Sequence, residues 1–374
     1  MPEAAQLEGE VRSWRSLTSQ LGAWQELLRV VDERTGLTVI AADPWSGTTG
    51  LLEELRREAR GPVLLVDARR CSDAAELGMA IADEAVRTFA LDATESWMRP
   101  AAPDADSAYR VRRQLLADGL DVDQLRTGVG DPLSILHGGL DAAASLASTV
   151  APVVVIDHLG QLLAGLRGVD ARAILETLRA AWQARTGACL ILVDFAGGQI
   201  EAALSDREHP LFHAGRRLRI QRAQPAAFAE SLIISKPVLR VDPTLLRESA
   251  ALAAGVPALT WQILDLAREI DAGDPATRAF GAWQRLRADR APLIAREWDV
   301  LRAVHRSAQA VAAAVSVNLP PYAAVTSTKS ARDALIQLRA VGQAWQPAPR
   351  SWALSSPLLT AWVAEHLPPR AQRP

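Results

Sequence analysis

Lysine is the residue that this sequence most nearly lacks. Among 374 residues only Lys236 and Lys329 are lysines, and arginine carries nearly all of the remaining positive charge. Genomic GC pressure explains such a replacement, but it does not remove a lysine that chemistry requires. A motif that normally contains lysine and has none here is therefore informative about its function.

Cysteines and long apolar runs are also scarce. Cys71 and Cys189 are the only cysteines and lie far apart, which excludes a disulfide framework and fits a reducing compartment. No run approaches the roughly 18 uninterrupted apolar residues that a membrane-spanning helix needs. The opening residues, MPEAAQLEGEVRSW, are acidic and polar, unlike a secretory signal. We therefore expect a cytoplasmic protein without membrane contact.

Composition and charge favour several folded domains. Hydrophobic residues make up 49% of the chain, which excludes a disordered protein, and 374 residues favour two or three domains. The net charge of −2 hides an asymmetry. From Arg285 onward, 11 arginines and one lysine face five acids, a net +7 that leaves −9 for the rest. A basic C-terminal region indicates contact with nucleic acid, although charge alone does not establish it.

The first part of the chain alternates between apolar runs and amphipathic segments. The expected strands are 37–43, 61–69, 151–159, 188–195 and 216–223, and the expected helices are 51–60, 72–90, 133–148 and 171–186. Near-continuous apolar strands alternating with helices are typical of a parallel sheet covered on both faces. We predict an amphipathic helix within residues 7–35, an irregular connection over 92–132, and an α/β core over 37–224 that follows an N-terminal helical segment, 1–36.

The second part of the chain is expected to be mainly helical. Three helical segments predict a small lid domain over residues 225–288. Residues 289–374 then show helices at 297–304, at 308–315 and from 326 onward, followed by an extended pair at 344–354. This order is that of a helix-turn-helix domain with a wing. The residues expected to contact duplex DNA are Thr328, Lys329, Arg332 and Arg339, although such domains also bind proteins.

A phosphate-binding loop motif lies between the first expected strand and its helix. In Gly-x-x-x-x-Gly-Lys-Ser/Thr, backbone amides cradle phosphate, the lysine bridges two phosphates, and the hydroxyl binds Mg²⁺. The matching window is ADPWSGTT, in which Gly47 and Thr49 stand at the second glycine and the hydroxyl. Ala42 replaces the first glycine, and Thr48 replaces the lysine. We predict that residues Gly47 to Gly50 line an ATP or ADP site that lacks its cation.

The lost lysine leaves three interpretations of this loop. Phosphoryl transfer depends on cations near the γ-phosphate, so hydrolysis should be weak. The helix N-terminus can still attract an anion, although Asp43 places a carboxylate in the loop. The loop therefore hydrolyses nucleotide, binds it without turnover, or is a turn without a ligand. Trp45, inside the loop, either fills the phosphate space or stacks on a partner.

Two further strand ends carry acidic residues. Asp157 ends the strand VVVID and is expected to hold Mg²⁺ together with Thr49. His158 stands where a glutamate usually activates the attacking water; it is either a base or a structural residue. Asp194 ends the strand CLILVD at the expected position of a polar sensor of the γ-phosphate, where a carboxylate would weaken triphosphate binding.

This order of elements resembles the archaeal-ATPase branch of the STAND group of AAA+ P-loop ATPases, which is related to the origin-recognition ATPases. Three stretches carry the resemblance: HPLFHAGRR from His209 with the LRIQRAQPAAFAESL that follows, the tripeptide Gly255-Val256-Pro257, and SPLLTAWV from Ser356. The likeness covers roughly residues 15–366. Its departures from the family pattern concentrate in the nucleotide-binding motifs, which suggests a fold that was retained while catalysis was relaxed.

The resemblance also implies roles for particular residues. Arg216 or Arg217 would take the arginine position near the nucleotide or a neighbouring subunit. Pro257 would pack near the base, although Gly255-Val256-Pro257 is also typical of an ordinary helix break. The C-terminal domain would be a winged helix.

The predicted function is a regulatory or scaffolding AAA+/STAND-like protein. It would bind ATP or ADP with Mg²⁺ without efficient hydrolysis, and signal to a protein partner, to a homo- or hetero-oligomer, or to DNA. One alternative is an active ATPase completed by a neighbouring subunit's arginine. Another is a DNA-binding regulator in which the ATPase fold serves only as a scaffold.

Overall fold

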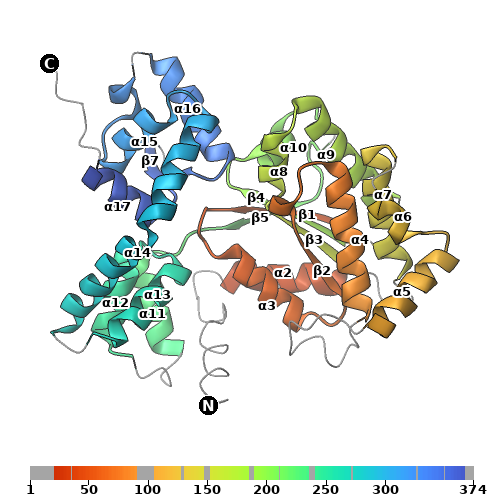
Figure 1. The fold of residues 1–374 in the computed structure, drawn as a ribbon, viewed down its shortest axis with the longest axis horizontal. Helices are drawn as coiled ribbons and strands as arrows, with labels where there is room; N and C mark the ends of the chain where they lie inside the picture. Colours follow the sequence, from red (N-terminus) through yellow and green to blue (C-terminus); the bar gives the residue numbers. More distant parts are fainter. Residues whose placement is uncertain are drawn as a thin grey trace. The chain divides into compact units, whose positions relative to one another are not determined.

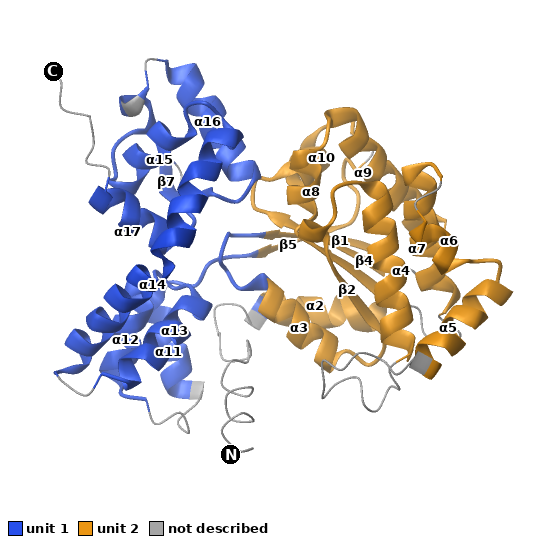
Figure 2. Cartoon of the chain, viewed as in Figure 1, with its two compact units in different colours: residues 1–22, 42–48, 220–374 blue, residues 23–41, 49–219 orange. Residues whose placement is uncertain are grey.

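The structure is a computed structural model of the chain (Figure 1). It describes residues 21–34, 36–90, 105–127, 130–146, 152–184, 189–209, 211–235, 241–270, 273–325, 327–348 and 350–366. The chain divides into two compact units, coloured separately in Figure 2. The sheet unit contains residues 23–41 and 49–219, and the C-terminal unit contains residues 42–48 and the chain from Ile220 onward.

The sheet unit is built around five strands. The strands are β1 (Gly36–Ala42), β2 (Val63–Asp67), β3 (Val153–Asp157), β4 (Cys189–Phe195) and β5 (Arg216–Ile220), in the order β2-β3-β4-β1-β5. The helices are α2 (Leu21–Glu33), α3 (Thr48–Glu58), η3 (Ala68–Arg70), α4 (Ala74–Ala90), α5 (Ala105–Ala117), α6 (Val122–Arg126), α7 (Pro132–Ser145), α8 (Leu159–Gly165), α9 (Gly168–Gln183) and α10 (Gln199–Ser205). The chain leaves β1 for β2 at one edge and later returns to β5 on the other side of β1. Parallel sheets bind ligands where connections diverge in this way.

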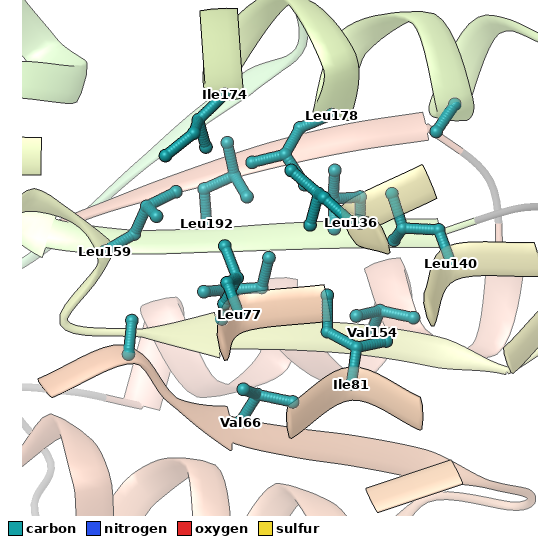
Figure 3. Packing of buried hydrophobic residues seen from close by; sticks show 14 of the residues in the cluster. Val66, Leu77, Ile81, Leu136, Leu140, Val154, Leu159, Ile174, Leu178 and Leu192 are labelled. Atoms are coloured by element: carbon teal, nitrogen blue, oxygen red, sulfur yellow. The ribbon is translucent and has the colours of Figure 1, made fainter. Parts of the chain in front are cut away.

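One face of the sheet carries the main apolar core. Val154 of β3 and Leu192 of β4 point into it and meet Leu77 and Ile81 of α4 and Leu136 of α7 (Figure 3). Each of these side chains is at least nine-tenths buried. Burial of one such side chain contributes about 2 kcal/mol to the free energy of folding, so the packing of α4 and α7 on this face is strongly stabilising.

The opposite face is covered by α2 and α3 (Figure 1). Alternate residues of a strand point to opposite faces, and Val153 and Val155, which alternate with Val154, are also fully buried. The thiol of Cys189 points to the carbonyl of Val30 in α2, with 3.9 Å between Sγ and O. Both faces of the sheet at these strands are therefore buried from solvent, which explains the near-continuous apolar strands.

Part of the connection predicted to be irregular is helical. Residues 91–104 lie outside the described residues, but α5 and α6 occupy much of the segment from 105 to 127. The side chain of Asp121 caps α6 by accepting from the amides of Asp123 and Gln124, and Leu115 of α5 is fully buried in the core. The prediction of irregular structure was wrong there. Many residues of these helices are polar and exposed, so the few apolar residues on their buried face were not recognised as a helical pattern.

The C-terminal unit is helical apart from one hairpin. Its elements are α11 (Pro225–Ser235), α12 (Pro243–Leu252), α13 (Pro257–Arg268), α14 (Pro275–Val304), α15 (Ala308–Ser316), η5 (Pro321–Ala324), α16 (Thr328–Ala340), β6 (Ala344–Ala348), β7 (Ser351–Leu354) and α17 (Pro357–His366). The boundary predicted between residues 288 and 289 lies inside α14, which is one helix of 30 residues. Its first half packs with α12 and α13, and α15, α16 and α17 also contact it. The predicted order of helices followed by a hairpin is present.

The described helices include none that is long and apolar enough to cross a membrane.

Candidate functional site

The loop that follows β1 is held in place by its first residue. Asp43 donates its amide to the carbonyl of Ile220, the last residue of β5, over 2.8 Å. Its Oδ2 accepts the amide of Arg222 over 3.0 Å. Asp43 is 6% exposed, so the carboxylate that the sequence places in the loop is buried and bound to the chain that leaves β5.

The backbone of this loop contains two residues with positive φ. Gly47 has φ +79°, and Trp45 has φ +61°, which is a strained value for a residue with a large side chain. The Trp45 side chain is 42% exposed. This exposure does not decide between filling the phosphate space and stacking on a partner, so both roles that the sequence suggested for Trp45 stay predictions.

Thr48 stands at the lysine position of the motif, and its hydroxyl is bonded to that of Ser46. Oγ of Ser46 and Oγ1 of Thr48 lie 2.8 Å apart in a hydrogen bond, and Ser46 and Thr48 are 3% and 8% exposed. α3 begins at Thr48, and the first amides of a helix have no acceptor within the helix. The loop thus offers helix amides to an anion without any cation of its own.

The two residues predicted to hold Mg²⁺ do come together. Thr49 Oγ1 donates a hydrogen bond of 2.8 Å to Oδ2 of Asp157. The other carboxylate oxygen of Asp157 accepts the amide of His158 over 2.9 Å. Both Thr49 and Asp157 belong to the sheet unit. A hydroxyl from the start of α3 and a carboxylate from the end of β3 therefore form one oxygen pair.

His158 lies between two carboxylates. Its Nδ1 is 3.2 Å from Oδ2 of Asp157 and 3.5 Å from Oδ1 of Asp67, but the nitrogen is buried without an aligned hydrogen bond. Its φ of +59° places it in the left-handed region just before α8. The left-handed backbone and the partly buried ring fit a structural role as well as the role of a base, and both interpretations stay predictions.

Asp67 is a site residue that the sequence analysis missed. It ends β2 and pairs in register with Asp157 of the adjacent parallel strand. The guanidinium of Arg69 donates to both of its carboxylate oxygens, over 2.8 to 3.2 Å. Partial burial raises the pKa of Asp67, but hydrogen bonds from Arg69 outweigh burial, so the pKa is lowered overall. Its position became apparent only from the register of β2 beside β3, because neighbouring parallel strands end at one edge of a sheet.

Asp194 points into the protein rather than into open space. Its carboxylate oxygens accept the amides of Phe195 over 2.7 Å and Ile200 over 2.9 Å. A Cβ atom on Gly160 or Gly198 would overlap this carboxylate. Burial raises the pKa of Asp194 to about 6. Its contacts tie the end of β4 to the first turn of α10, so the prediction of a γ-phosphate sensor gains no support here.

The two arginines of the family motif lie at the start of β5. Arg216 donates to Glu33 over 3.0 Å and to Glu26 over 3.4 Å, both on α2. Arg217 donates to the carbonyl of Leu204 over 2.6 Å. These contacts occur at the opposite end of β5 from Ile220. They use both guanidinium groups within the sheet unit and do not support a nucleotide contact.

Pro257 is the first residue of α13. Gly255 precedes it with φ +74°, and a Cβ atom at Gly255 would overlap the carbonyl oxygen of Ala223. Glycine is therefore required for both reasons: the backbone needs positive φ, and it approaches the segment between β5 and α11 closely. The contact with a base that was predicted for Pro257 stays a prediction.

The residues predicted to contact DNA lie on α16. Thr328, Lys329 and Arg332 are exposed, and among the described residues neither Lys329 nor Arg332 has an ion-pair partner. Arg339 is partly buried and already has an interaction within the chain. The start of α16 is joined to the start of α15 by a hydrogen bond of 2.7 Å between the hydroxyls of Ser330 and Ser307.

Comparisons with known proteins identify a related fold. No family model matches the chain, and no curated protein matches it. Among solved structures, the chain is similar to the Aeropyrum pernix ORC2 protein, determined as ADPNP–ADP complexes. The two are 15% identical, the match covers 93% of each chain, and the TM-score is 0.54. At this identity the likeness shows the fold alone, and it confirms the predicted α/β fold with a parallel sheet, similar to that of this ORC2 protein.

Proposed function

We propose that this chain is a regulatory AAA+-like protein that binds ATP or ADP with Mg²⁺, hydrolyses it inefficiently, and signals to a macromolecular partner through its C-terminal unit. The observation that carries the proposal is the contrast between two neighbouring residues. Thr49 keeps its hydrogen bond to Asp157, whereas Thr48, at the lysine position, is bonded to Ser46.

The magnesium side of the site fits the ion. Mg²⁺ prefers oxygen ligands and is commonly bound by one or two carboxylates together with phosphates of the nucleotide. Thr49 Oγ1 and Asp157 Oδ2, 2.8 Å apart, supply a hydroxyl and a carboxylate of that kind. These two residues would hold the ion, which would neutralise phosphate charge when nucleotide is bound.

The phosphate side fits binding better than turnover. The amides at the start of α3 and the helix dipole favour an anion. However, no lysine reaches the phosphates from position 48, and transition-state stabilisation in phosphoryl transfer depends on such cations. Binding with little hydrolysis follows from this combination. The ADPNP and ADP of the Aeropyrum pernix ORC2 complexes are consistent with a nucleotide in this fold.

Calorimetric titration of the full chain with ATP and ADP, with and without Mg²⁺, tests the proposal. Mg²⁺-dependent binding is expected, and Thr49→Ala should weaken it about tenfold, because hydrogen bonds to charged groups contribute about 1.5–3 kcal/mol. Thr177→Ala is the matched control, since the Thr177 hydroxyl donates to the carbonyl of Ala173 within α9, away from Thr49 and Asp157.

Two results would contradict this function. No heat and no thermal shift with millimolar nucleotide would remove the nucleotide from the proposal and leave a scaffold. Multiple-turnover hydrolysis that Asp157→Asn abolishes would instead favour an active ATPase completed by a neighbouring subunit. Sedimentation velocity during turnover would then show whether a homo-oligomer supplies the missing cation.

A second candidate is a DNA-binding regulator with a winged-helix C-terminal domain. The observation in its favour is that Lys329 and Arg332, near the start of α16, are exposed and form no ion pair with any other residue that the structure describes. A helix in this position after two others, followed by the β6–β7 hairpin, has the element order of a recognition helix with its wing. A protein partner could use the same surface, and the salt dependence of binding to DNA separates the two.

A further inference from the structure

Arg222 is a buried arginine outside the motifs considered so far. It lies between β5 and α11 and is 9% exposed. Its Nη2 donates a hydrogen bond of 2.7 Å to the carbonyl oxygen of Ser355, the residue after β7. Its guanidinium carbon also lies 5.2 Å from the centre of the Trp345 ring on β6. The Arg222 side chain therefore contacts the β6 strand at Trp345 and the residue that directly follows β7.

The backbone of the same residue holds the loop after β1. The Arg222 amide donates to Oδ2 of Asp43 over 3.0 Å, and Asp43 donates its own amide to Ile220 over 2.8 Å. All of these residues belong to the C-terminal unit. One residue thus binds the loop through its main chain and the hairpin through its side chain.

The hydrogen bonds continue from the hairpin to α16. The amide of Ser355 donates to the carbonyl of Gln343 over 3.0 Å, and the amide of Gln343 donates to the carbonyl of Leu338 in α16 over 2.8 Å. An unbroken series of contacts therefore joins Asp43 to the helix that carries Lys329 and Arg332. Coupling between distant parts of a protein is carried by contiguous networks of this kind when they have two arrangements.

Several polar atoms in this network are buried without hydrogen bonds. Among the described residues, these include Nε of Arg222, Nε1 of Trp345 and Oγ of Ser355. Burial also lowers the pKa of Arg222 to about 10, although Asp43 acts in the opposite direction. Unmade buried hydrogen bonds destabilise the closed arrangement relative to one in which these groups reach water. These unsatisfied groups therefore favour release of the Arg222 side chain from the hairpin.

We propose that Asp43 and Arg222 form a latch that couples the loop after β1 to the β6–β7 hairpin and α16. When Asp43 moves away, the Arg222 amide loses its acceptor, the guanidinium leaves Ser355, and the hairpin loosens. A phosphate group at the loop would repel the Asp43 carboxylate and act in this direction. The coupling is a property of the chain itself and does not require that nucleotide binds.

Hydrogen exchange of the full chain without nucleotide tests the latch. Asp43→Ala and Arg222→Gln should each speed exchange of the amides from Gln343 to Leu359 about tenfold. The double variant should exchange no faster than the single variants, because both changes open the same contact. Asp43→Asn, which keeps an acceptor oxygen, should restore most of the protection.

Two internal references keep the test independent of folding. Amides of β3 should exchange as in the unchanged protein, which shows that the variants have not lost global stability. Arg287→Gln is the matched control, because it removes a guanidinium that binds Glu365 on α17 without touching Asp43. In the double variant Arg287→Gln with Asp43→Ala, the two increases in exchange rate should multiply, as expected for independent sites.

The latch would be overturned by either of two outcomes. In the first, Asp43→Ala leaves the amide of Ser355 as protected as before while Arg222→Gln exposes it. In the second, the effects of Asp43→Ala and Arg222→Gln multiply as for independent sites. Neither outcome bears on nucleotide binding, which calorimetry measures separately.

Discussion

The hydroxyls of Ser46 and Thr48 share a hydrogen bond of 2.8 Å inside the loop after β1. Both residues are almost fully buried. The side chain at the lysine position is therefore hydrogen-bonded within the loop and leaves no empty space there. A closed pair leaves no unsatisfied group behind. The loop can therefore keep its shape without a ligand, which is what a regulatory site with weak turnover requires.

Restoring the lysine should strengthen nucleotide binding. Thr48→Lys is expected to raise the affinity for ATP roughly tenfold or more, because a charge-assisted contact to phosphate contributes about 1.5–3 kcal/mol. The gain should be larger for ATP than for ADP, since the lysine of such loops reaches the last phosphates. Calorimetry measures both. Thr48→Met is the control, because it also breaks the pair with Ser46 but adds no charge. Equal affinities of the two variants would count against a phosphate site here.

Asp194 should make stability depend on pH in an unusual direction. Burial raises its pKa from 3.8 to about 6 in the folded protein. The folded state then holds a proton that the unfolded state has released, so stability falls as pH rises from about 4 through about 6 and is constant above about 7. A shift of about two units corresponds to about 3 kcal/mol.

Urea denaturation at pH 4, 5, 6 and 7 measures this effect. Comparison with Asp194→Asn isolates the residue, because the other carboxylates titrate equally in both proteins. The stability of the unchanged protein relative to the variant should fall by about 3 kcal/mol between pH 4 and pH 7. Parallel stability curves for the two proteins would show that Asp194 has an ordinary pKa.

Gly160 and Gly198 should tolerate no side chain. A Cβ atom at either position would overlap the Asp194 carboxylate, and overpacking of this kind costs about 1–3 kcal/mol. Gly160→Ala should therefore lower the free energy of unfolding, measured with urea, by about that amount. Gly165→Ala, in the same helix but with open space around it, should be neutral or slightly stabilising. If both alanine variants behave alike, the packing of Asp194 against α8 is not as described.

The sheet was predictable because its strands are short and, apart from the basic β5, apolar on both faces. The runs that end in Asp157 and Asp194 could be recognised from composition alone, and they appear as β3 and β4. The short helices α8 and α10 were not foreseen. α8 follows His158 in the left-handed region, and α10 begins where Asp194 accepts the amide of Ile200. Neither feature has a local sequence signal, because the first is an unusual backbone conformation and the second depends on a side chain bound across six residues.

The candidate site was predictable in its order along the chain but not in its contacts. Thr49 and Asp157 lie within hydrogen-bonding distance, as the motif order led us to expect, and their role in holding Mg²⁺ stays a prediction. Asp67 was missed because nothing in VLLVD distinguishes it until β2 is placed beside β3. The contacts of Arg222 with Asp43 and Ser355 join residues 179 and 133 positions apart. Pairings of that range depend on the fold, and one sequence does not reveal them.

If α16 contacts DNA, its affinity should depend on salt through Lys329 and Arg332. Each lost phosphate contact reduces the slope of log K against log salt by about 0.9, so Lys329→Ala with Arg332→Ala should reduce it by about 2. Fluorescence anisotropy with a labelled duplex, from about 50 to 200 mM salt, measures the slope. Arg285→Ala is the matched control, because Arg285 is already paired with Glu269 on the neighbouring α13 end. An unchanged slope, or no binding at the lowest salt, would assign this surface to a protein partner instead.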